Sequence, residues 1–150
     1  MRLRHASRRG ATVVEAAVTA PAVFLLLLGL VVGGMGMFRY QQVASLARQA
    51  ARYASVHGTQ YAKDTGNPAA TPADIYNSAI APNAVGLDLS RLSYAVTWNT
   101  SNRPYHTDIV NNTVVATGNT VSVTVTYQWV PEAYLGGVTL TSTSVMPMSY

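Results

Sequence analysis

The pattern of hydrophobic positions changes twice along the chain. Residues 16–38 contain no charged side chain, and a helix of this length can cross the ~30 Å hydrocarbon layer of a bilayer. Residues 39–57 are rich in good helix formers. Their apolar positions recur at helical spacing, at Val43, Leu46, Ala47, Ala50, Tyr53 and Ala54. The pattern predicts one long helix over about residues 12–57, apolar all round in its first part and amphipathic in its second.

The segment after this helix predicts a loop and then a short helix. Residues 58–70 are turn-rich, and Gly58 is a plausible end signal for the long helix. Thr71 can cap a new helix, Pro72 suits its first turn, and Asp74 stands where the acid of a capping box belongs. This short helix is expected to run to about Ala81 and to stop at Pro82.

The remainder predicts strands. Apolar and polar side chains alternate over residues 92–98 and, most clearly, over 121–129. Residues 138–145 are a third candidate, and 113–116 are a short fourth. Short connections favour an antiparallel sheet of three to four strands, with one face packed on the second half of the long helix. The fold class is therefore α+β: one long N-terminal membrane-spanning helix and a small C-terminal domain.

The charge distribution predicts the orientation of the helix in the membrane. Charged residues are only 11% of the chain, against roughly a quarter in ordinary soluble domains. Residues 11–150 have no formal net charge, so the folded domain lacks the basic face that nucleic-acid binding requires. Four of the ten basic residues stand in the first nine positions: Arg2, Arg4, Arg8 and Arg9. This basic leader is typical of a topology signal that keeps the N-terminus cytoplasmic.

These boundaries give four segments. They are the leader 1–10, the transmembrane helix 11–38, its extracytoplasmic extension 39–57 and the extracytoplasmic α+β domain 58–150. A cleaved secretory signal peptide is the competing interpretation of the apolar run. The run is longer than the usual apolar core of ~7–15 residues, and no convincing A-x-A site follows it, so a retained anchor is favoured.

The sharpest motif lies where the leader meets the apolar run. Gly10 is a site at which a membrane-embedded protease could reach the backbone. Cleavage after Gly10 would make Ala11 the new N-terminus and Glu15 its fifth residue. The new amino group and the carboxylate could then pair within or between subunits and set the axial register of packed helices. Alternatively, Glu15 sits at the headgroup level near the leader arginines, favoured by the helix N-terminus.

The segment 8–15 resembles the class III signal of type IVb prepilins and pseudopilins: a basic leader, a Gly, and a Glu at the fifth mature position. RRGATVVEAAVTAPAVFLLLLGL followed by RYQQVASLARQAARYAS is similar to the TadE-like proteins of the tight-adherence (Tad/Flp) pilus system. Glu15 and Pro21 match the family's Glu-led apolar segment with an early Pro. Residues 47–53 match its Ala/Arg-rich helix, and 121–129 resemble its Val/Thr strand. Ala16 departs from the Phe or Tyr that usually follows the Glu.

The resemblance implies a pilin-like protein of the bacterial inner membrane. A prepilin peptidase would process it after Gly10, and its helix would pack with those of other pilin-like subunits. Its role would be that of a minor subunit or assembly factor of a pilus or a related secretion system, with possible incorporation into a surface filament that serves adhesion. The alternative is an uncleaved membrane-anchored binding module with an extracytoplasmic ligand or partner.

Three positions inside the apolar run bear on helix packing. Pro21 could kink the helix for packing in a filament, or it is a membrane proline that is locally tolerated. Gly29 and Gly33 form a G-x-x-x-G pair that permits close helix–helix contact, although glycine is also common in membrane helices generally.

The sequence predicts no enzyme. It contains no G-x-S-x-G, P-loop or H-E-x-x-H motif, and its six acidic residues are scattered singly. His57, His106 and Asp108 lack the spacing of a metal site, and the last two are expected in a solvated loop. We therefore expect no cofactor, no metal and no small-molecule substrate.

Overall fold

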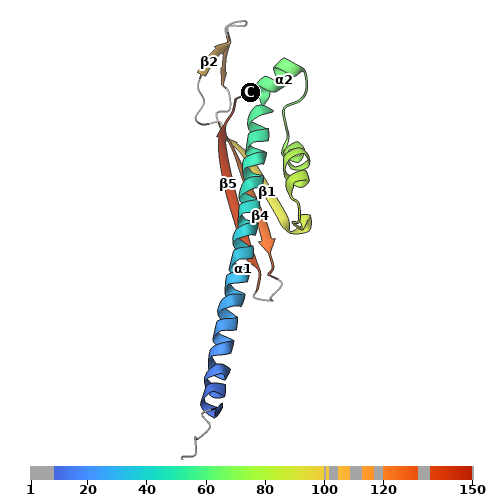
Figure 1. The fold of residues 1–150 in the computed structure, drawn as a ribbon. Coiled ribbons are helices and arrows are strands. Elements are labelled where there is room, and N and C mark those ends of the chain that lie inside the picture. The colour runs from blue at the N-terminus through green and yellow to red at the C-terminus, as the bar shows by residue number, and fades with distance from the viewer. Residues whose placement is uncertain are drawn as a thin grey trace, which may run out of the picture. The chain divides into compact units, whose positions relative to one another are not determined.

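The computed structural model describes residues 9–99, 101, 105–108, 113–116, 120–131 and 136–149. Its helices are α1 (Arg9–Val56), α2 (Thr59–Thr65) and α3 (Pro72–Ile75), with short turns η1 (Tyr76–Ile80), η2 (Ala81–Asn83) and η3 (Leu89–Arg91). Its strands are β1 (Leu92–Asn99), β2 (Tyr105–Asp108), β3 (Thr113–Ala116), β4 (Thr120–Trp129) and β5 (Val138–Pro147) (Figure 1). The chain divides into two compact units, Met1–Met37 and Phe38–Tyr150, and α1 contributes residues to each.

The first unit holds the apolar part of α1. Nearly every side chain that the structure describes there is exposed, including Val18, Phe24 and Leu30 at 65–70%. Within Thr12–Val56 the helix is long and apolar enough to cross a membrane. Such a surface is stable only where lipid or other helices replace water. The predicted span is therefore confirmed as a helix with the length and the composition needed to cross a membrane.

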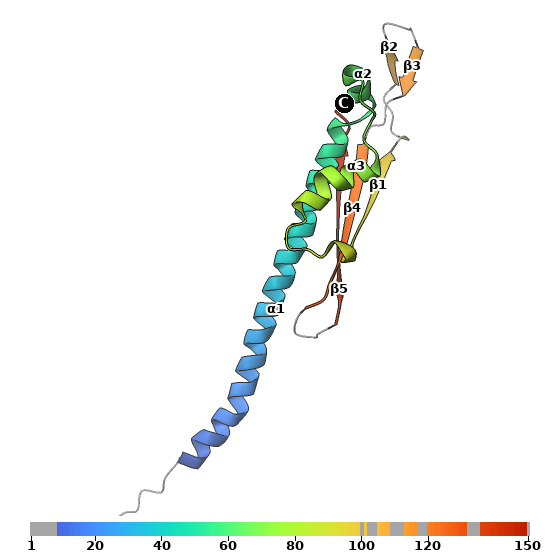
Figure 2. The same cartoon turned by 90° about the vertical axis from the view of Figure 1, so that its right-hand side faces the viewer.

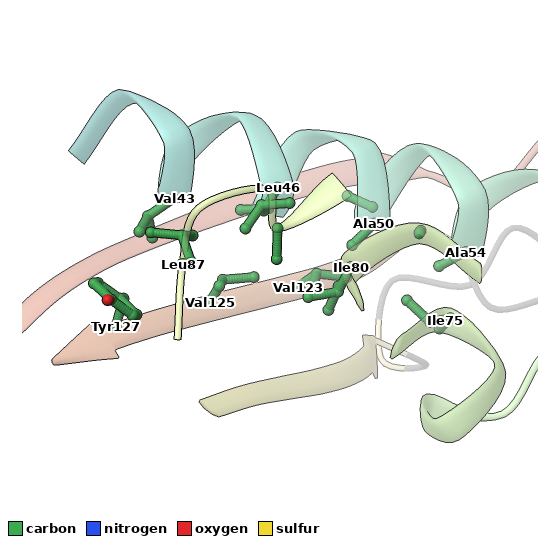
Figure 3. Close-up of a cluster of buried hydrophobic side chains, with 14 of the residues drawn as sticks. Val43, Leu46, Ala50, Ala54, Ile75, Ile80, Leu87, Val123, Val125 and Tyr127 are labelled. Carbon is green, nitrogen blue, oxygen red and sulfur yellow. The ribbon is translucent and has the colours of Figure 1, made fainter. Parts of the chain in front are cut away.

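The second unit is built on the C-terminal part of α1. A row of apolar side chains on α1, most of them alanines, is completely or almost completely buried: Val43, Leu46, Ala47, Ala50, Ala51 and Ala54. Opposite them lie Val123, Val125 and Tyr127 of β4 (Figure 3), and Val121 of the same strand belongs to the same buried cluster. The alanines let the helix backbone approach the sheet closely, and the valines, branched at Cβ, fill the pleated surface. The predicted packing of the sheet's apolar face on this half of the helix is confirmed.

The main sheet has three antiparallel strands in the order β1-β4-β5. The central strand β4 pairs Val123 with Val96 of β1 and with Ser144 of β5. On the outer face, hydroxyl groups bond across the β4–β5 ladder. Thr124 Oγ1 lies 2.8 Å from Thr143 Oγ1. The predicted α+β fold with this antiparallel sheet is therefore confirmed, and β4 has the expected alternation of buried and partly exposed positions.

The fourth strand does not join that sheet. β3 pairs instead with β2 in a separate antiparallel pair, with Tyr105 opposite Ala116. The prediction that His106 and Asp108 lie in a loop is therefore wrong, because they belong to β2. The run Tyr-His-Thr-Asp has no apolar alternation, so backbone pairing with β3 creates a strand that the sequence pattern does not reveal.

The segment 58–70 also differs from its prediction. Residues 59–65 form α2 rather than a loop, and the helix ends at Gly66, whose φ of 74° is the left-handed cap conformation that glycine adopts readily. Gly58 precedes α2 and has a φ of −88°, so it is not a left-handed end cap for α1. The turn signals of this segment mark the two ends of a short helix.

The second short helix begins as predicted. The Thr71 hydroxyl accepts a hydrogen bond from the Asp74 backbone N–H at 3.3 Å, and Asp74 Oδ2 accepts one from the Thr71 backbone N–H at 2.9 Å. This is a complete capping box. The helical path does not stop at Ala81, because it continues as a 3-10 turn through Asn83 with Pro82 inside it.

Candidate functional site

The predicted cleavage position lies near the start of the described part of α1. The Gly10–Ala11 peptide bond lies within α1, whose described residues begin at Arg9. Gly10 is exposed, and a Cβ placed on it would meet no atom within 4 Å. A protease would therefore meet no described side chain over Gly10, although it would have to unwind the helix locally to bind this bond in an extended form.

Glu15 lies within α1, six positions after Arg9, the first residue of the helix that the structure describes. It is exposed, its backbone carbonyl accepts a hydrogen bond from Thr19 Oγ1 at 2.8 Å, and no described basic residue forms an ion pair with its carboxylate. Removal of residues 1–10 would bring the new N-terminus and this carboxylate within about one turn.

The leader arginines are not positioned by the fold. Arg2, Arg4 and Arg8 lie outside the described residues, and Arg9 is described only as the first backbone position of α1. Their role as a topology signal stays a prediction.

The three packing positions lie within an unbroken helix. α1 continues through Pro21, and a Cβ placed on Gly29 or Gly33 would meet no atom within 4 Å. Gly29 and Gly33 are four residues apart and therefore share a face of the helix. That face is open to a neighbouring helix, as a G-x-x-x-G contact needs, but the contact itself stays a prediction.

One feature that the sequence pattern does not predict begins at Arg39, the first charged residue after the apolar run. Arg39 Nη1 donates to the carbonyl of Gly86 at 2.8 Å and to Gln42 Oε1 at 3.0 Å, and Gln42 Nε2 donates to the carbonyl of Val85 at 3.3 Å. Gly86 has a φ of 73°, which a residue with a side chain rarely adopts. These contacts, here named the Arg39 clasp, hold the loop at 85–86 against α1.

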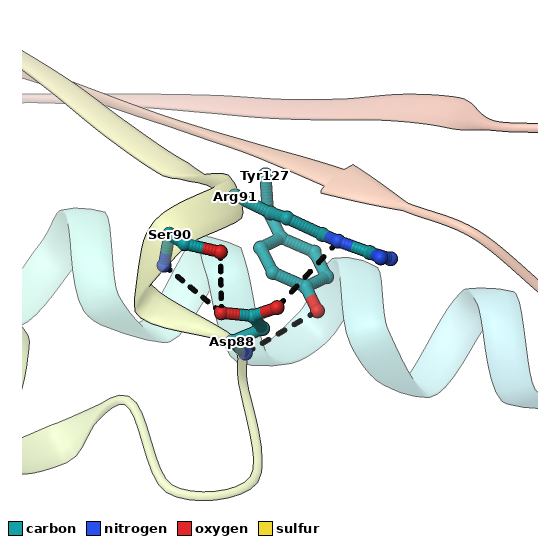
Figure 4. Close-up of polar contacts among 4 residues, drawn as sticks. All are labelled: Asp88, Ser90, Arg91 and Tyr127. Atoms are coloured by element: carbon teal, nitrogen blue, oxygen red, sulfur yellow. Dashed lines mark hydrogen bonds and ion pairs between the residues drawn. The ribbon is translucent and has the colours of Figure 1, made fainter.

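A second polar cluster stands at the start of β1 (Figure 4). Asp88 Oδ1 accepts hydrogen bonds from the hydroxyl and backbone N–H of Ser90 at 2.7 Å and 3.0 Å. These bonds, with a smaller contribution from Arg91, hold the pKa of Asp88 below its ordinary value. The Asp88 N–H in turn donates to the Tyr127 hydroxyl at 3.4 Å. The cluster caps η3 and ties it to β4, which is a structural role.

The part of the chain that the structure describes contains no group of three or more His, Cys, Asp or Glu side chains that could hold a metal ion. The two polar features of interest are therefore the carboxylate of Glu15 within the apolar part of α1 and the Arg39 clasp.

A family model described as TadE-like protein matches residues 10–52. This segment of the chain is TadE-like. The match confirms the resemblance and extends from Gly10 through Glu15, the apolar helix and most of the amphipathic part of α1. The TadE-like match indicates a function related to the Tad pilus, in a family that is generally non-enzymatic. Neither a curated protein nor a solved structure matches the chain.

Proposed function

We propose that the protein is a pilin-like minor subunit or assembly factor of a Tad/Flp-type pilus or related secretion system, processed by a prepilin peptidase after Gly10. The observation that carries this proposal is the TadE-like match over residues 10–52, which begins at the glycine itself. The exposed Gly10 suits a cleavage site, and Glu15 is then the fifth residue of the product.

In this proposal the N-terminus lies in the cytoplasm, α1 crosses the inner membrane, and residues 58–150 lie on the extracytoplasmic side. The exposed apolar surface of α1 supports insertion, and the leader arginines support the direction. Within the membrane, the open face at Gly29 and Gly33 would contact the helices of other pilin-like subunits. An ion pair between Glu15 and a neighbour's new amino group would neutralise a buried charge and fix the axial register.

The deciding experiment is the intact mass and N-terminal sequence of the protein from cells with a matching, active prepilin peptidase. We expect a chain that begins at Ala11. A Gly10→Val variant should remain full-length, because its branched side chain would crowd the exposed backbone at the cleavage site. A Gly29→Val variant, changed equally but far from the site, should still be cleaved.

A wild-type chain that still begins at Met1, while the same peptidase cleaves another substrate, would overturn the processing step. That result would instead favour the uncleaved membrane-anchored binding module.

A further inference from the structure

The exposed hydrophobic side chains of the second unit gather at one of its ends. Among the residues of this unit whose exposure the structure describes, nine large hydrophobic ones are exposed, and three of them, Val56, Trp98 and Val145, lie elsewhere. The other six define what we call the apolar rim: Phe38, Tyr40, Val85, Leu89, Val130 and Val138. Val85 is 75% exposed, which is the largest exposure in this set.

Several independent contacts place the rim at the end of the unit that carries Phe38. The Arg39 clasp holds Val85 beside the first turns of this part of α1. Figure 3 shows Tyr127 and Leu87 at the Val43 end of the core, whereas Ile75 lies at the Ala54 end. β4 therefore runs toward the Phe38 end as it passes Tyr127.

The two strands β4 and β5 supply the rest of the rim. Val130 directly follows β4, and Val138 opens β5 opposite Trp129. Figure 2 shows this end of the β4–β5 pair directed away from α2. Leu92 pairs with Tyr127, so η3 and Leu89, just before β1, lie at the same end of the sheet.

The charges near the rim suit a boundary between lipid and water. β4 and β5 contain no charged residue at all. The described charged side chains at this end are Arg39, which is hydrogen-bonded to the loop, and Asp88 and Arg91, which form an ion pair at 3.5 Å. Tyr40 and the partly buried Trp129 are of the residue types that are enriched at headgroup level. At the opposite end, α2 carries the exposed charges Lys63 and Asp64.

We propose that the apolar rim of the extracytoplasmic domain lies in the lipid interface of the membrane. The rim thereby adds to the helix a second membrane contact that fixes the height and tilt of the domain. This inference rests on the membrane anchoring proposed above. Lipid is the favoured occupant because the rim is continuous along the chain with the charge-free run: that run ends at Phe38, itself a rim residue, and Arg39 and Tyr40 follow at once.

The test uses single cysteines, which the chain allows because it contains none of its own. Val138→Cys reports on the rim. Val145→Cys is the matched control, since it has the same residue type, lies on the same strand and is likewise exposed. Leu27→Cys reports on the helix in the first unit. Each full-length variant is spin-labelled in nanodiscs of phosphatidylethanolamine and phosphatidylglycerol, and its accessibility to oxygen and to a water-soluble nickel complex is measured.

We expect the labels at 138 and 27 to favour oxygen and the label at 145 to favour the nickel complex. A label at 138 that favours the nickel complex while the label at 27 favours oxygen would overturn the rim proposal and leave the anchor intact. Preference for the nickel complex at both 138 and 27 would overturn the membrane anchor itself. A label at 138 shielded from both reagents would show that protein covers the rim, which also overturns the proposal.

Discussion

The guanidinium of Arg39 and the backbone carbonyl of Gly86 lie 2.8 Å apart, although 47 positions separate these residues in the chain. The contact joins the long helix to the loop that leads into the sheet, at the position where the apolar run ends. It fixes the path of the loop between η2 and η3, because the Gly86 carbonyl has to face α1 in order to accept the bond.

Arg39→Gln should therefore destabilise the second unit. The lost charged hydrogen bond is partly exposed, so we expect a cost of about 1 kcal/mol, or a fall in Tm of roughly 4 °C, measured in micelles by tryptophan fluorescence. Arg48→Gln is the control, because Arg48 is exposed and its Nε donates only to the Ala44 carbonyl of its own helix. Equal losses in the two variants would contradict a specific role for the clasp.

The core predicts a difference between two valines. Val123 is completely buried on β4, whereas Val145 on β5 is 61% exposed. Val123→Ala removes two buried methyl groups and leaves a cavity, so we expect a loss of about 2–3 kcal/mol. Val145→Ala should change the stability by less than about 0.5 kcal/mol. Similar melting curves for the two variants would show that β4 does not face α1 as described.

The capping box makes a prediction about pH. The pKa of Asp74 is lowered from 3.8, first by the Thr71 hydroxyl and then by the Thr71 backbone N–H. Because the folded pKa lies below the unfolded one, the stabilisation by Asp74 is present above pH 3.8 and is lost as pH falls through the folded value. NMR titration of the Asp74 carboxyl should show a midpoint below 3.8.

Thr71→Ala tests the same box without changing the carboxylate. It should move that midpoint back toward the ordinary value and cost about 1 kcal/mol of stability above pH 5, as the loss of an N-cap usually does. An unchanged midpoint would mean that the box does not persist in solution.

Glu15→Ala should separate insertion from assembly. Removing the carboxylate makes the helix more apolar, so membrane insertion should be unimpaired, whereas recovery in assembled complexes should fall at least roughly tenfold because the partner charge is left buried and unpaired. Cross-linking and membrane fractionation measure the two effects. Thr19→Ala, one turn away, is the control. Normal assembly of Glu15→Ala would sink the register hypothesis.

The parts of the fold that the sequence predicts are those with a strong local period. Val121, Val123 and Val125 alternate with hydroxyl residues, and the strand is buried on one face as that period requires. β2 was missed because its pairing with β3 is a contact between strands and leaves no local pattern. The sequence does not predict α2, because the turn signals at Gly58 and Gly66 outweigh a helix of seven residues, Thr59–Thr65, which is too short to show a period.

The candidate site divides in the same way. Gly10 and Glu15 are easy to recognise in the sequence. Gly10 directly follows the basic leader, and Glu15 directly precedes the charge-free run. The Arg39 clasp cannot be recognised in the sequence, because the acceptor of its main hydrogen bond is a backbone carbonyl, which any residue type supplies. The sequence does not predict the rim either, because Val85, Leu89 and Val138 come from a loop, a 3-10 turn and the start of a strand, which only folding brings to one end.

The segment that follows β5 is hydrogen-bonded to the end of α1, which is far away in the sequence. The Ser149 N–H donates to the Ser55 carbonyl at 3.1 Å, joining positions that are 94 residues apart. The alanine row on α1 is made early in synthesis, yet its cover, β4, is made more than halfway through the chain. Contacts so distant in sequence form slowly. A newly made chain therefore passes through a stage with an anchored helix and an uncovered apolar face, at which premature association with other helices competes with folding.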